Sequence, residues 1–454
     1  MSMPHKAGRV FPGELTPDQI AQAPVLVRGE GVYLFDEAGK KYLDAIAGIA
    51  VVSVGYGREE VVEAMTQQAR ELPYCISNIF ANEPSQALAR RLAELTPGDL
   101  NQVHFVSGGS EAVETAVKLA RQYHLENGQP DRYLVIARRQ SYHGATLGAL
   151  SATGMSGRRD KYLPLLLDFP HIAPVYCYRC PFGQAYPGCD LACAQELEEE
   201  IRKVGPGRVS AFIAEPVVGA ACGATAPPPE YFPRIREICS RYGVLFIADE
   251  VITGLGRTGK NFGIDHWKVA PDMMTLAKSL GGGYAPLGAV VASDRLRQVF
   301  EDQGSAFEHI FTYAANPLST ATSLAVLDIL VEEELVSRAA QMGEILFRKV
   351  GALREHATVG DMRGKGLLLG VELVRDKGTK APFSPKLRVS KRLGAIALEK
   401  GLVIYPGSGS VDGVQGDHFL ICPPLVIREA EIDELVEKLD ASLSQLEREL
   451  GLSR

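Results

Sequence analysis

Short apolar runs alternate with helical segments through the middle of the chain. The runs Val103–Val106, Tyr133–Ile136, Ala211–Ala214 and Val244–Ala248 each have the length and composition of a buried strand. Segments with helical character separate them. Strands that alternate with helices are typical of a doubly wound α/β fold with a mainly parallel sheet. The pattern therefore predicts such a sheet between about residues 100 and 280.

The N-terminal part follows a different pattern. Residues up to about Ala23 carry several prolines, which favours an extended arm. Gly31–Asp44 predicts a hairpin, with two strands around a Glu-Ala-Gly turn. Arg58–Leu72 and Ser85–Leu95 have the apolar spacing of helices.

A further change of pattern occurs near Leu330. Two long helical segments there surround the apolar run Gly366–Leu373, which predicts a second α+β unit. The last predicted helix places five apolar side chains on one face: Ile432, Leu435, Leu439, Leu443 and Leu446.

Bulk composition narrows the function classes. The 454 residues contain 46% hydrophobic and 23% charged residues, as expected for a globular protein with more than one domain. The net charge of -7 argues against a nucleic-acid surface. No apolar run reaches membrane-spanning length, and the first residues lack the apolar core of a signal peptide. We therefore expect a cytoplasmic protein.

Charged residues directly follow two of the predicted strands. Asp249 and Glu250 follow Val244–Ala248, and Lys278 follows the apolar run Met273–Ala277. The carboxyl ends of parallel strands meet at one edge of a sheet, where ligands bind. A desolvated lysine there can form a Schiff base, and an aspartate can keep a pyridine nitrogen protonated. Taken alone, each residue is more often a cap, an ion-pair partner or a surface charge.

The segment Val103–Ala120 reads as a strand, a glycine-rich turn and a helix. The turn Ser107-Gly-Gly-Ser110 leaves bare N–H groups and a hydroxyl at a helix N-terminus, which is a phosphate cradle by geometry and dipole. Ser110 as an ordinary N-cap explains the same residues equally well.

Together these motifs resemble the class III pyridoxal-phosphate aminotransferases. The resemblance runs from about Tyr33 to the last helix, and rests on the order Asp249, Gly256-Arg-Thr-Gly259, then Ala277-Lys-Ser-Leu-Gly-Gly-Gly283. It implies fold type I: a mainly parallel seven-stranded-type sheet in a large domain, with a smaller α+β domain built from both chain ends. We expect an N-terminal arm and part of the small domain in residues 1–75. The cofactor-binding domain would follow in 76–330, and the rest of the small domain in 331–454.

The resemblance also implies roles for individual residues. Lys278 would hold pyridoxal 5′-phosphate as a Schiff base and act as general base, and Asp249 would bind the ring nitrogen. The other expected cofactor contacts are Gly109 and Ser110 at the phosphate, Tyr142 stacked on the ring with His143 beside it, Glu215 near the ring oxygen, and Val251 on the opposite face. Thr312 would reach the phosphate of a neighbouring subunit, which implies a homodimer with sites at its interface.

The implied reaction moves an amino group from an omega-amino acid or amine to a 2-oxo acid. Leu420 stands where many 2-oxoglutarate-using members carry an arginine. Pyruvate-using members often carry a mobile arginine in the preceding loop, and Tyr405–Asp417 contains none. The sequence Cys422-Pro-Pro-Leu425 resembles that of the pyruvate-using members, which favours pyruvate as acceptor. The small side chain near Ala50 predicts a roomier substrate pocket. A 4-aminobutyrate- or ornithine-type enzyme that uses 2-oxoglutarate, a racemase or epimerase, and a decarboxylase remain open alternatives.

Two other motifs suggest different chemistry. Gly254–Gly259 matches G-x-G-x-x-G but does not directly follow its strand or open a helix, which argues against dinucleotide binding. Four of the 8 cysteines form two close pairs with spacing compatible with zinc: Cys177, Cys180, Cys189 and Cys193. No histidine joins them, so we expect reduced thiols or a disulfide clip rather than a metal site.

Overall fold

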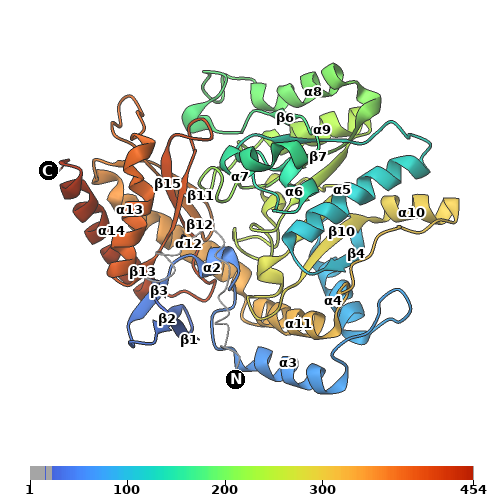
Figure 1. The fold of residues 1–454 in the computed structure, drawn as a ribbon, viewed down its shortest axis with the longest axis horizontal. Helices are drawn as coiled ribbons and strands as arrows, with labels where there is room; N and C mark the ends of the chain where they lie inside the picture. The colour runs from blue at the N-terminus through green and yellow to red at the C-terminus, as the bar shows by residue number, and fades with distance from the viewer. Residues whose placement is uncertain (1–15, 17–22, 453–454) are drawn as a thin grey trace, which may run out of the picture.

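A seven-stranded sheet forms the centre of the computed structural model, which describes residues 16 and 23–452 (Figure 1). Its strands lie in the order β4 (Leu100–Val106), β10 (Gly288–Ser293), β9 (Met273–Leu276), β8 (Leu245–Asp249), β7 (Val209–Ala214), β5 (Leu134–Arg138) and β6 (His171–Ile172). Pairing is parallel from β9 to β6, and only β10 runs antiparallel to its neighbours within this sheet. The predicted mainly parallel seven-stranded sheet is confirmed.

Both faces of this sheet are buried, as a doubly wound fold requires. Along β7, Ala211 and Ile213 join one apolar cluster, whereas Phe212 and Ala214 join the other. The first cluster lies under α5 (Gly109–Glu126) and α10 (Asp294–Gln303), and the second includes side chains of α9 (Tyr231–Tyr242). Alternate side chains of one strand thus point to opposite faces, which explains why the strands read as continuous apolar runs.

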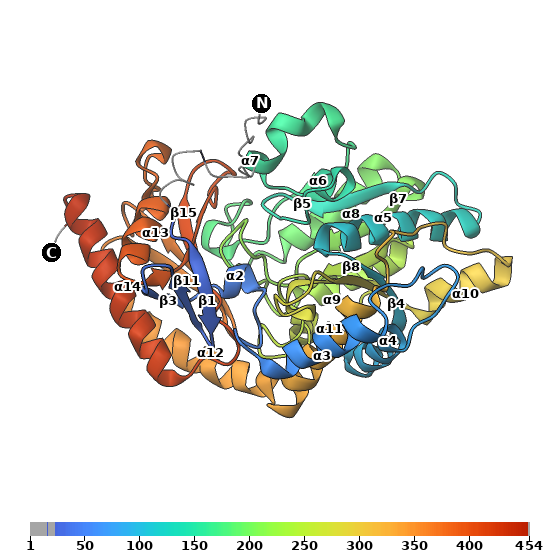
Figure 2. The same ribbon diagram turned by 60° about the horizontal axis from the view of Figure 1, so that its bottom comes forward.

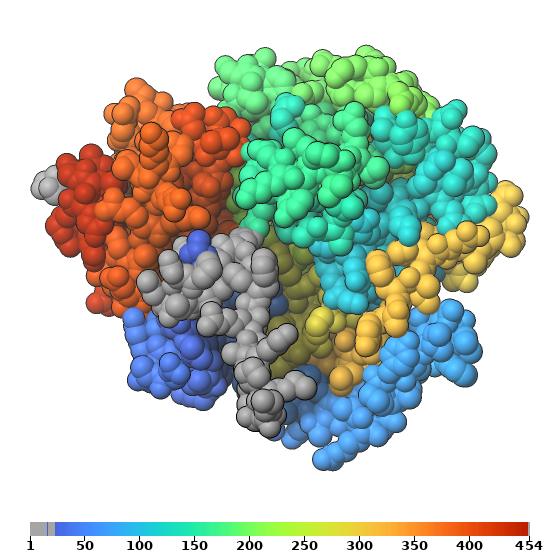
Figure 3. All heavy atoms as spheres, in the orientation of Figure 1, coloured from blue at the N-terminus to red at the C-terminus, as the bar shows by residue number. Residues whose placement is uncertain are grey.

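Two smaller four-stranded sheets accompany the central sheet, and the first combines strands from both ends of the chain. The first has the order β1 (Leu26–Glu30), β2 (Tyr33–Asp36), β3 (Lys41–Asp44) and β13 (Leu402–Val403), and β13 pairs parallel with β3. The second has the order β11 (Val359–Lys365), β12 (Leu368–Leu373), β15 (Asp417–Ile421) and β14 (Tyr405–Ser408). In the space-filling view, the dark blue early segment and the orange and red C-terminal segment lie on the same side (Figure 3). Domain boundaries after residues 75 and 330 stay a prediction.

The helices near these sheets agree with most predicted positions. α3 (Glu59–Glu71) and α4 (Glu83–Leu95) pack against α11 (Pro317–Glu332), as Figures 1 and 2 both show. α12 (Leu335–Gly351), α13 (Val389–Glu399) and α14 (Glu429–Glu449) follow, and the five predicted apolar side chains of α14 are fully buried. The remaining α-helices of the described residues are α2 (Ala47–Ala50), α6 (Leu147–Ala152), α7 (Ser156–Arg159) and α8 (Ala192–Val204).

The predicted hairpin is confirmed by the antiparallel pairing of β2 with β3. The predicted extended arm lies outside the described residues, except for Thr16 and Ala23. Among the helices of residues 16 and 23–452, none combines the length and the apolar character needed to span a membrane.

Glu250 joins the end of β8 to the loop that follows the glycine-rich turn. Its buried carboxylate accepts hydrogen bonds from the Thr253 hydroxyl and from the N–H groups of Gly263 (2.8 Å) and Ile264 (2.7 Å). A buried carboxylate is tolerated when its oxygens are satisfied in this way. Glu250 therefore fixes the chain path directly beside Asp249.

The substitution Glu250→Gln tests this junction. An amide N–H₂ cannot accept from the facing N–H groups, so we expect a loss of about 1–3 kcal/mol in the free energy of unfolding. Denaturant unfolding measures it, with the exposed Glu437→Gln as control. Equal stability of the two variants would contradict the junction role.

Candidate active site

The ends of several sheet strands surround a cavity of about 340 Å³. Parallel strands β5, β7, β8 and β9 end at the same edge, so the residues that follow them come together there. Residues lining the cavity are Val51, Ser107, Gly108, Gly109, Ser110, Tyr142, His143, Gly144, Glu215, Val217, Asp249, Val251, Ile252, Ala277, Lys278, Ala285, Pro286 and Leu287. All predicted site residues except Thr312 are among them.

Asp249 is held by contacts from three different segments. His143 Nδ1 lies 2.6 Å from Oδ2, while the Thr275 hydroxyl (3.0 Å) and the Val251 N–H (3.2 Å) donate to Oδ1. Asp249 is only 3% exposed, so these contacts replace the water that a carboxylate otherwise needs. Its orientation is therefore fixed toward the cavity.

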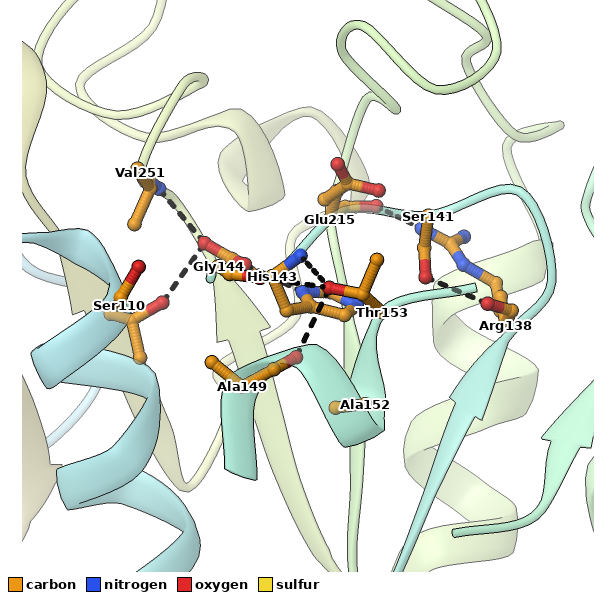
Figure 4. A network of polar contacts seen from close by, with 12 residues as sticks. Ser110, Arg138, Ser141, His143, Gly144, Ala149, Ala152, Thr153, Glu215 and Val251 are labelled. Carbon is orange, nitrogen blue, oxygen red and sulfur yellow. Dashed lines mark hydrogen bonds and ion pairs between the residues drawn. The ribbon is translucent and has the colours of Figure 1, made fainter. Parts of the chain in front are cut away.

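Figure 4 shows how His143 is supported in turn. Its N–H donates to the Thr153 hydroxyl (2.9 Å), and that hydroxyl donates to the carbonyl of Ala149 (3.1 Å) in α6. Nε2 of His143 is buried and has no hydrogen-bond partner within the described part of the chain. The ring is thus fixed by its backbone and by Nδ1.

Lys278 lies at the junction between β9 and the glycine-rich loop that follows. Its φ of 48° is in the left-handed region, which an L-residue adopts only when its surroundings impose it. Gly281 and Gly282 both donate N–H groups to the Lys278 carbonyl, at 3.1 and 3.0 Å. This tight turn aims the side chain into the cavity rather than into open solvent.

The Lys278 ammonium is electrostatically disfavoured. Burial lowers the pKa of Lys278 below that of an ordinary lysine, and the carboxylates of Asp249 and Glu215 only partly oppose this effect. A larger share of the amine is therefore neutral and nucleophilic than on a surface lysine.

An anion cradle forms another part of the cavity wall. The first bond within α5 runs from the Ala112 N–H to the Gly108 carbonyl, so the preceding N–H groups at this helix N-terminus have no helical partner. Ser110 Oγ accepts from the Ala145 N–H (3.0 Å), which leaves its own proton available to a ligand. Exposed N–H groups and the helix dipole favour a phosphate at this position.

Three further predicted residues complete the cavity wall. Tyr142 and Val251 both line it, and burial raises the pKa of Tyr142. Glu215 follows β7, and burial raises its pKa to about 7. Arg138 donates to the Glu215 backbone carbonyl (2.5 Å), whereas Glu215 Oε2 is buried without a partner among the described residues (Figure 4). That oxygen is available to a ligand group.

The sequence analysis did not identify every residue that contributes to the site. Thr275 was not predicted, although its position opposite Asp249 in the β8–β9 register explains its role. Ala50 is buried, and its neighbour Val51 lines the cavity, so the roomier pocket near Ala50 stays a prediction. Ile252 lines the cavity as an apolar group.

Thr312 does not reach the cavity of its own chain. It is exposed, and its carbonyl accepts from the Tyr74 hydroxyl (3.1 Å). Its expected role at a neighbouring subunit is therefore compatible with this position but is not tested within one chain.

The two cysteine pairs can be compared with the zinc alternative. All four cysteines, Cys177, Cys180, Cys189 and Cys193, are free thiols. Within residues 16 and 23–452 there is no group of three or more histidine, cysteine or acidic side chains arranged to hold a metal ion. The structure gives no support to the zinc alternative.

Gly254–Gly259 likewise forms no dinucleotide site. The segment is a series of turns, and the next helical turn begins only at Gly263. Arg257 of this segment is fully buried and donates to the carbonyls of Leu367 (3.2 Å) and Pro423 (2.5 Å). Its role is to connect the large sheet to the C-terminal segments.

Comparison with known proteins agrees with this geometry. The model of the family "Aminotransferase class-III" matches residues 17–443. A putrescine–pyruvate aminotransferase of Pseudomonas aeruginosa is 39% identical over 93% of this chain and 91% of its own length. A diaminobutyrate–2-oxoglutarate transaminase of Halomonas elongata is 36% identical over 94% and 91%. The crystal structure of an (S)-enantioselective omega-transaminase from Thermomicrobium roseum has a TM-score of 0.90 and 40% identity, and the match covers 97% of this chain and 96% of that one.

Gly144→Ala tests the anion cradle. Gly144 has a φ of 138°, and a Cβ there would lie 2.6 Å from Ser110 Oγ and 2.9 Å from the Ala149 Cβ. We expect a loss of about 1–3 kcal/mol in stability from strain and crowding. We also expect inorganic phosphate to raise the melting temperature less than in the unmodified protein. Gly157→Ala is the control, since a Cβ at Gly157 would meet no atom within 4 Å. An undiminished phosphate effect in Gly144→Ala would contradict the cradle.

Proposed function

Because the chain belongs to the class III aminotransferases, which depend on pyridoxal phosphate, we propose that it transfers an amino group from an omega-amino acid or amine to pyruvate. One observation carries the proposal: Asp249 and Lys278 line one cavity from neighbouring strand ends, and the same cavity is lined by the anion cradle at Gly109 and Ser110.

The residues present fit pyridoxal phosphate. The α5 N-terminus and Ser110 would hold the phosphate, and the Asp249 carboxylate would accept a hydrogen bond from the protonated ring nitrogen. The Lys278 amine would bind covalently to the aldehyde carbon of the cofactor. The buried, unpartnered Oε2 of Glu215 would face the ring oxygen, where a carboxyl with a pKa of about 7 can share a proton. When bound, this cofactor supplies an aldehyde for the amine and a ring that withdraws electrons from the reacting carbon.

The chain's own groups would move the proton and fix the geometry. Because its pKa is lowered, the Lys278 amine can act as a general base that takes a proton from the substrate carbon. The same amine, once protonated, can act as a general acid and donate that proton again. Asp249 keeps its charge toward the ring because His143 and Thr275 hold both of its oxygens. Tyr142 and Val251 would cover the two ring faces and exclude water.

A monocarboxylate acceptor suits this cavity better than a dicarboxylate. Within the described residues its lining contains no arginine, so the second carboxylate of 2-oxoglutarate would have no obvious cationic partner. Leu420 is 1% exposed in β15 and does not line the cavity. The similarity to a putrescine–pyruvate aminotransferase supports pyruvate as the acceptor. The similarity to a diaminobutyrate–2-oxoglutarate transaminase supports 2-oxoglutarate as the alternative acceptor.

An exposed apolar surface near Thr312 supports a homodimer. Two segments expose large apolar or aromatic side chains, and they contact each other through the rings of Tyr74 and Tyr313. The exposed fractions of these side chains are 39–68%, and the residues are Tyr74, Ile76, Ile79, Phe80, Ile310 and Tyr313. Apolar surface of this kind is typical of a subunit interface. A second copy docked here would bring Thr312 to the partner's anion cradle. We also propose a cytoplasmic location, in agreement with the free thiols.

Lys278→Ala tests the proposed chemistry. No other lysine lines the described cavity, so we expect transamination to fall at least about 1,000-fold. The visible absorbance of the purified protein should also lose its response to an amine donor. Exposed Lys260→Ala is the control. Product analysis with and without an oxo acid separates transfer from racemisation and decarboxylation, and a Lys278→Ala protein with full turnover would exclude the assignment.

Thr312→Ala tests the dimeric site. Loss of a hydroxyl that donates to a phosphate should weaken cofactor binding by about 10- to 150-fold, because hydrogen bonds to charged groups contribute about 1.5–3 kcal/mol. Dialysis followed by titration with pyridoxal phosphate measures this, and Thr312→Ser should retain the cofactor. A monomeric protein in solution, or unchanged retention in Thr312→Ala, would argue against a shared site.

A further inference from the structure

The segment that carries Thr312 is attached to helix α5 of its own chain. Three side chains of α5 contact this segment, and their spacing of three and four residues places them on one face of the helix: Thr115, Lys118 and Gln122. The same helix begins at the anion cradle described above. One helix therefore supports both its own cradle and the segment expected to reach the cradle of a partner subunit.

Gln122 holds the backbone of this segment. Its amide nitrogen donates to the Ala306 carbonyl (2.9 Å), and its amide oxygen accepts from the Glu308 N–H (3.0 Å). These two bonds fix the chain directly before His309, which lies three residues ahead of Thr312. The position of the His309 side chain therefore influences the path of the chain up to Thr312.

The imidazole of His309 lies between two side chains of α5. Its Nε2 lies 2.9 Å from the Thr115 hydroxyl, and its Nδ1 lies 3.0 Å from the Lys118 ammonium. The Thr115 hydroxyl donates its one proton to the Glu111 carbonyl (2.7 Å), so it accepts from Nε2. An ammonium has donors alone, so Nδ1 accepts from Lys118. Both contacts together require the neutral imidazole with its proton on Nε2.

Protonation of this imidazole would remove its acceptor and place a second positive charge beside Lys118. Burial lowers the pKa of His309, and the charge of Lys118 adds to this effect, whereas the carboxylates of Glu114 and Glu111 partly oppose it. The ring of His104 in β4 has its centre 5.8 Å from that of His309, and burial lowers the pKa of His104 to about 4. A free histidine binds a proton more readily than the attached His309 does. The attachment is therefore strongest above about pH 6.5 and weakens as the pH falls below that value.

We propose that His309 is a positioning residue that fixes the Thr312 segment on α5 and thereby orients the Thr312 hydroxyl toward the cofactor phosphate held by the partner subunit. This inference rests on the proposed function, since it names what positions Thr312 in the shared site. His309 itself touches neither substrate nor cofactor, so turnover per bound cofactor does not depend on it.

Release of pyridoxal phosphate from the purified holoenzyme during dialysis, followed by absorbance, tests the proposal. Near neutral pH, release from His309→Ala should be about tenfold faster than from the unmodified protein, because a contact that supports phosphate binding is lost. His309→Gln should retain the cofactor, since an amide can donate to Thr115 and accept from Lys118. Glu308→Ala is the control, because the contact of Glu308 with α5 uses its backbone N–H.

The pH profile of release separates positioning from a general loss of stability. In the unmodified protein, release should become at least about threefold faster between neutral pH and about pH 5.5, beyond any change seen in His309→Gln. The Gln side chain does not titrate, whereas titration of the cofactor itself affects both proteins equally. Equal pH profiles in the two proteins would overturn the proposal.

A double variant decides whether His309 acts through Thr312. Thr312→Ala alone should speed release, and addition of His309→Ala should change the rate by less than about twofold, since residues that act as a unit are not additive. Fully additive losses would overturn the proposal. Unchanged release from His309→Ala, in an enzyme that loses cofactor through Thr312→Ala, would also overturn it.

Unchanged release from Thr312→Ala would instead contradict the shared site of the proposed function. Hydrogen exchange of residues 306–313 in the holoenzyme still decides the attachment in that case. Faster exchange of this segment in the unmodified protein than in His309→Gln at about pH 5.5, with equal exchange near neutral pH, supports the role of His309. Equal exchange at both pH values would overturn it.

Discussion

A buried carboxylate held from three sides is the interaction on which this structure depends. Asp249 is almost entirely removed from water, and an unpaired carboxylate in such a place would be strongly destabilising. His143, Thr275 and the Val251 N–H provide the missing partners, and they come from the segment after β5, from β9 and from the turn after β8. The register of the parallel strands therefore determines both the stability of the site and the direction of its charge.

The same strand edge explains why an amine with a lowered pKa lies near this carboxylate. Asp249 pairs with Thr275 across the β8–β9 register, and Lys278 follows three residues later in a left-handed turn. Glu250, beside Asp249, fixes the loop that follows, so the two adjacent acids have separate tasks. The short strand β8 thus positions both Asp249, which faces the cavity, and Glu250, which stabilises the fold.

Local patterns were sufficient to predict most of this arrangement. Apolar runs identified the central strands, and the charged residues after them identified Asp249 and Lys278, because parallel strands end at a common edge. The glycine-rich turn before α5 identified Gly109 and Ser110 for a similar local reason. Tyr142, His143, Glu215 and Val251 were assigned through the family resemblance, and the structure brings all four to the cavity.

Other features depend on packing between distant segments and leave no local signal. Thr275 could be assigned only from strand register, because it lies opposite Asp249 in the pairing of β8 with β9. The choice of Val51 over Ala50 depends on backbone direction in a turn where Gly48 and Ile49 have positive φ. Thr312 remains a prediction, because its expected ligand would belong to another copy of the chain.

The central claim is that the Lys278 amine is the covalent attachment point of the cofactor, opposite Asp249. Borohydride treatment of the purified protein, followed by proteolysis and mass spectrometry, identifies the lysine that carries the reduced pyridoxyl group. We expect that group on Lys278 alone. A pyridoxyl group on any other lysine, or a protein that purifies without the cofactor and cannot be loaded with it, would contradict the account.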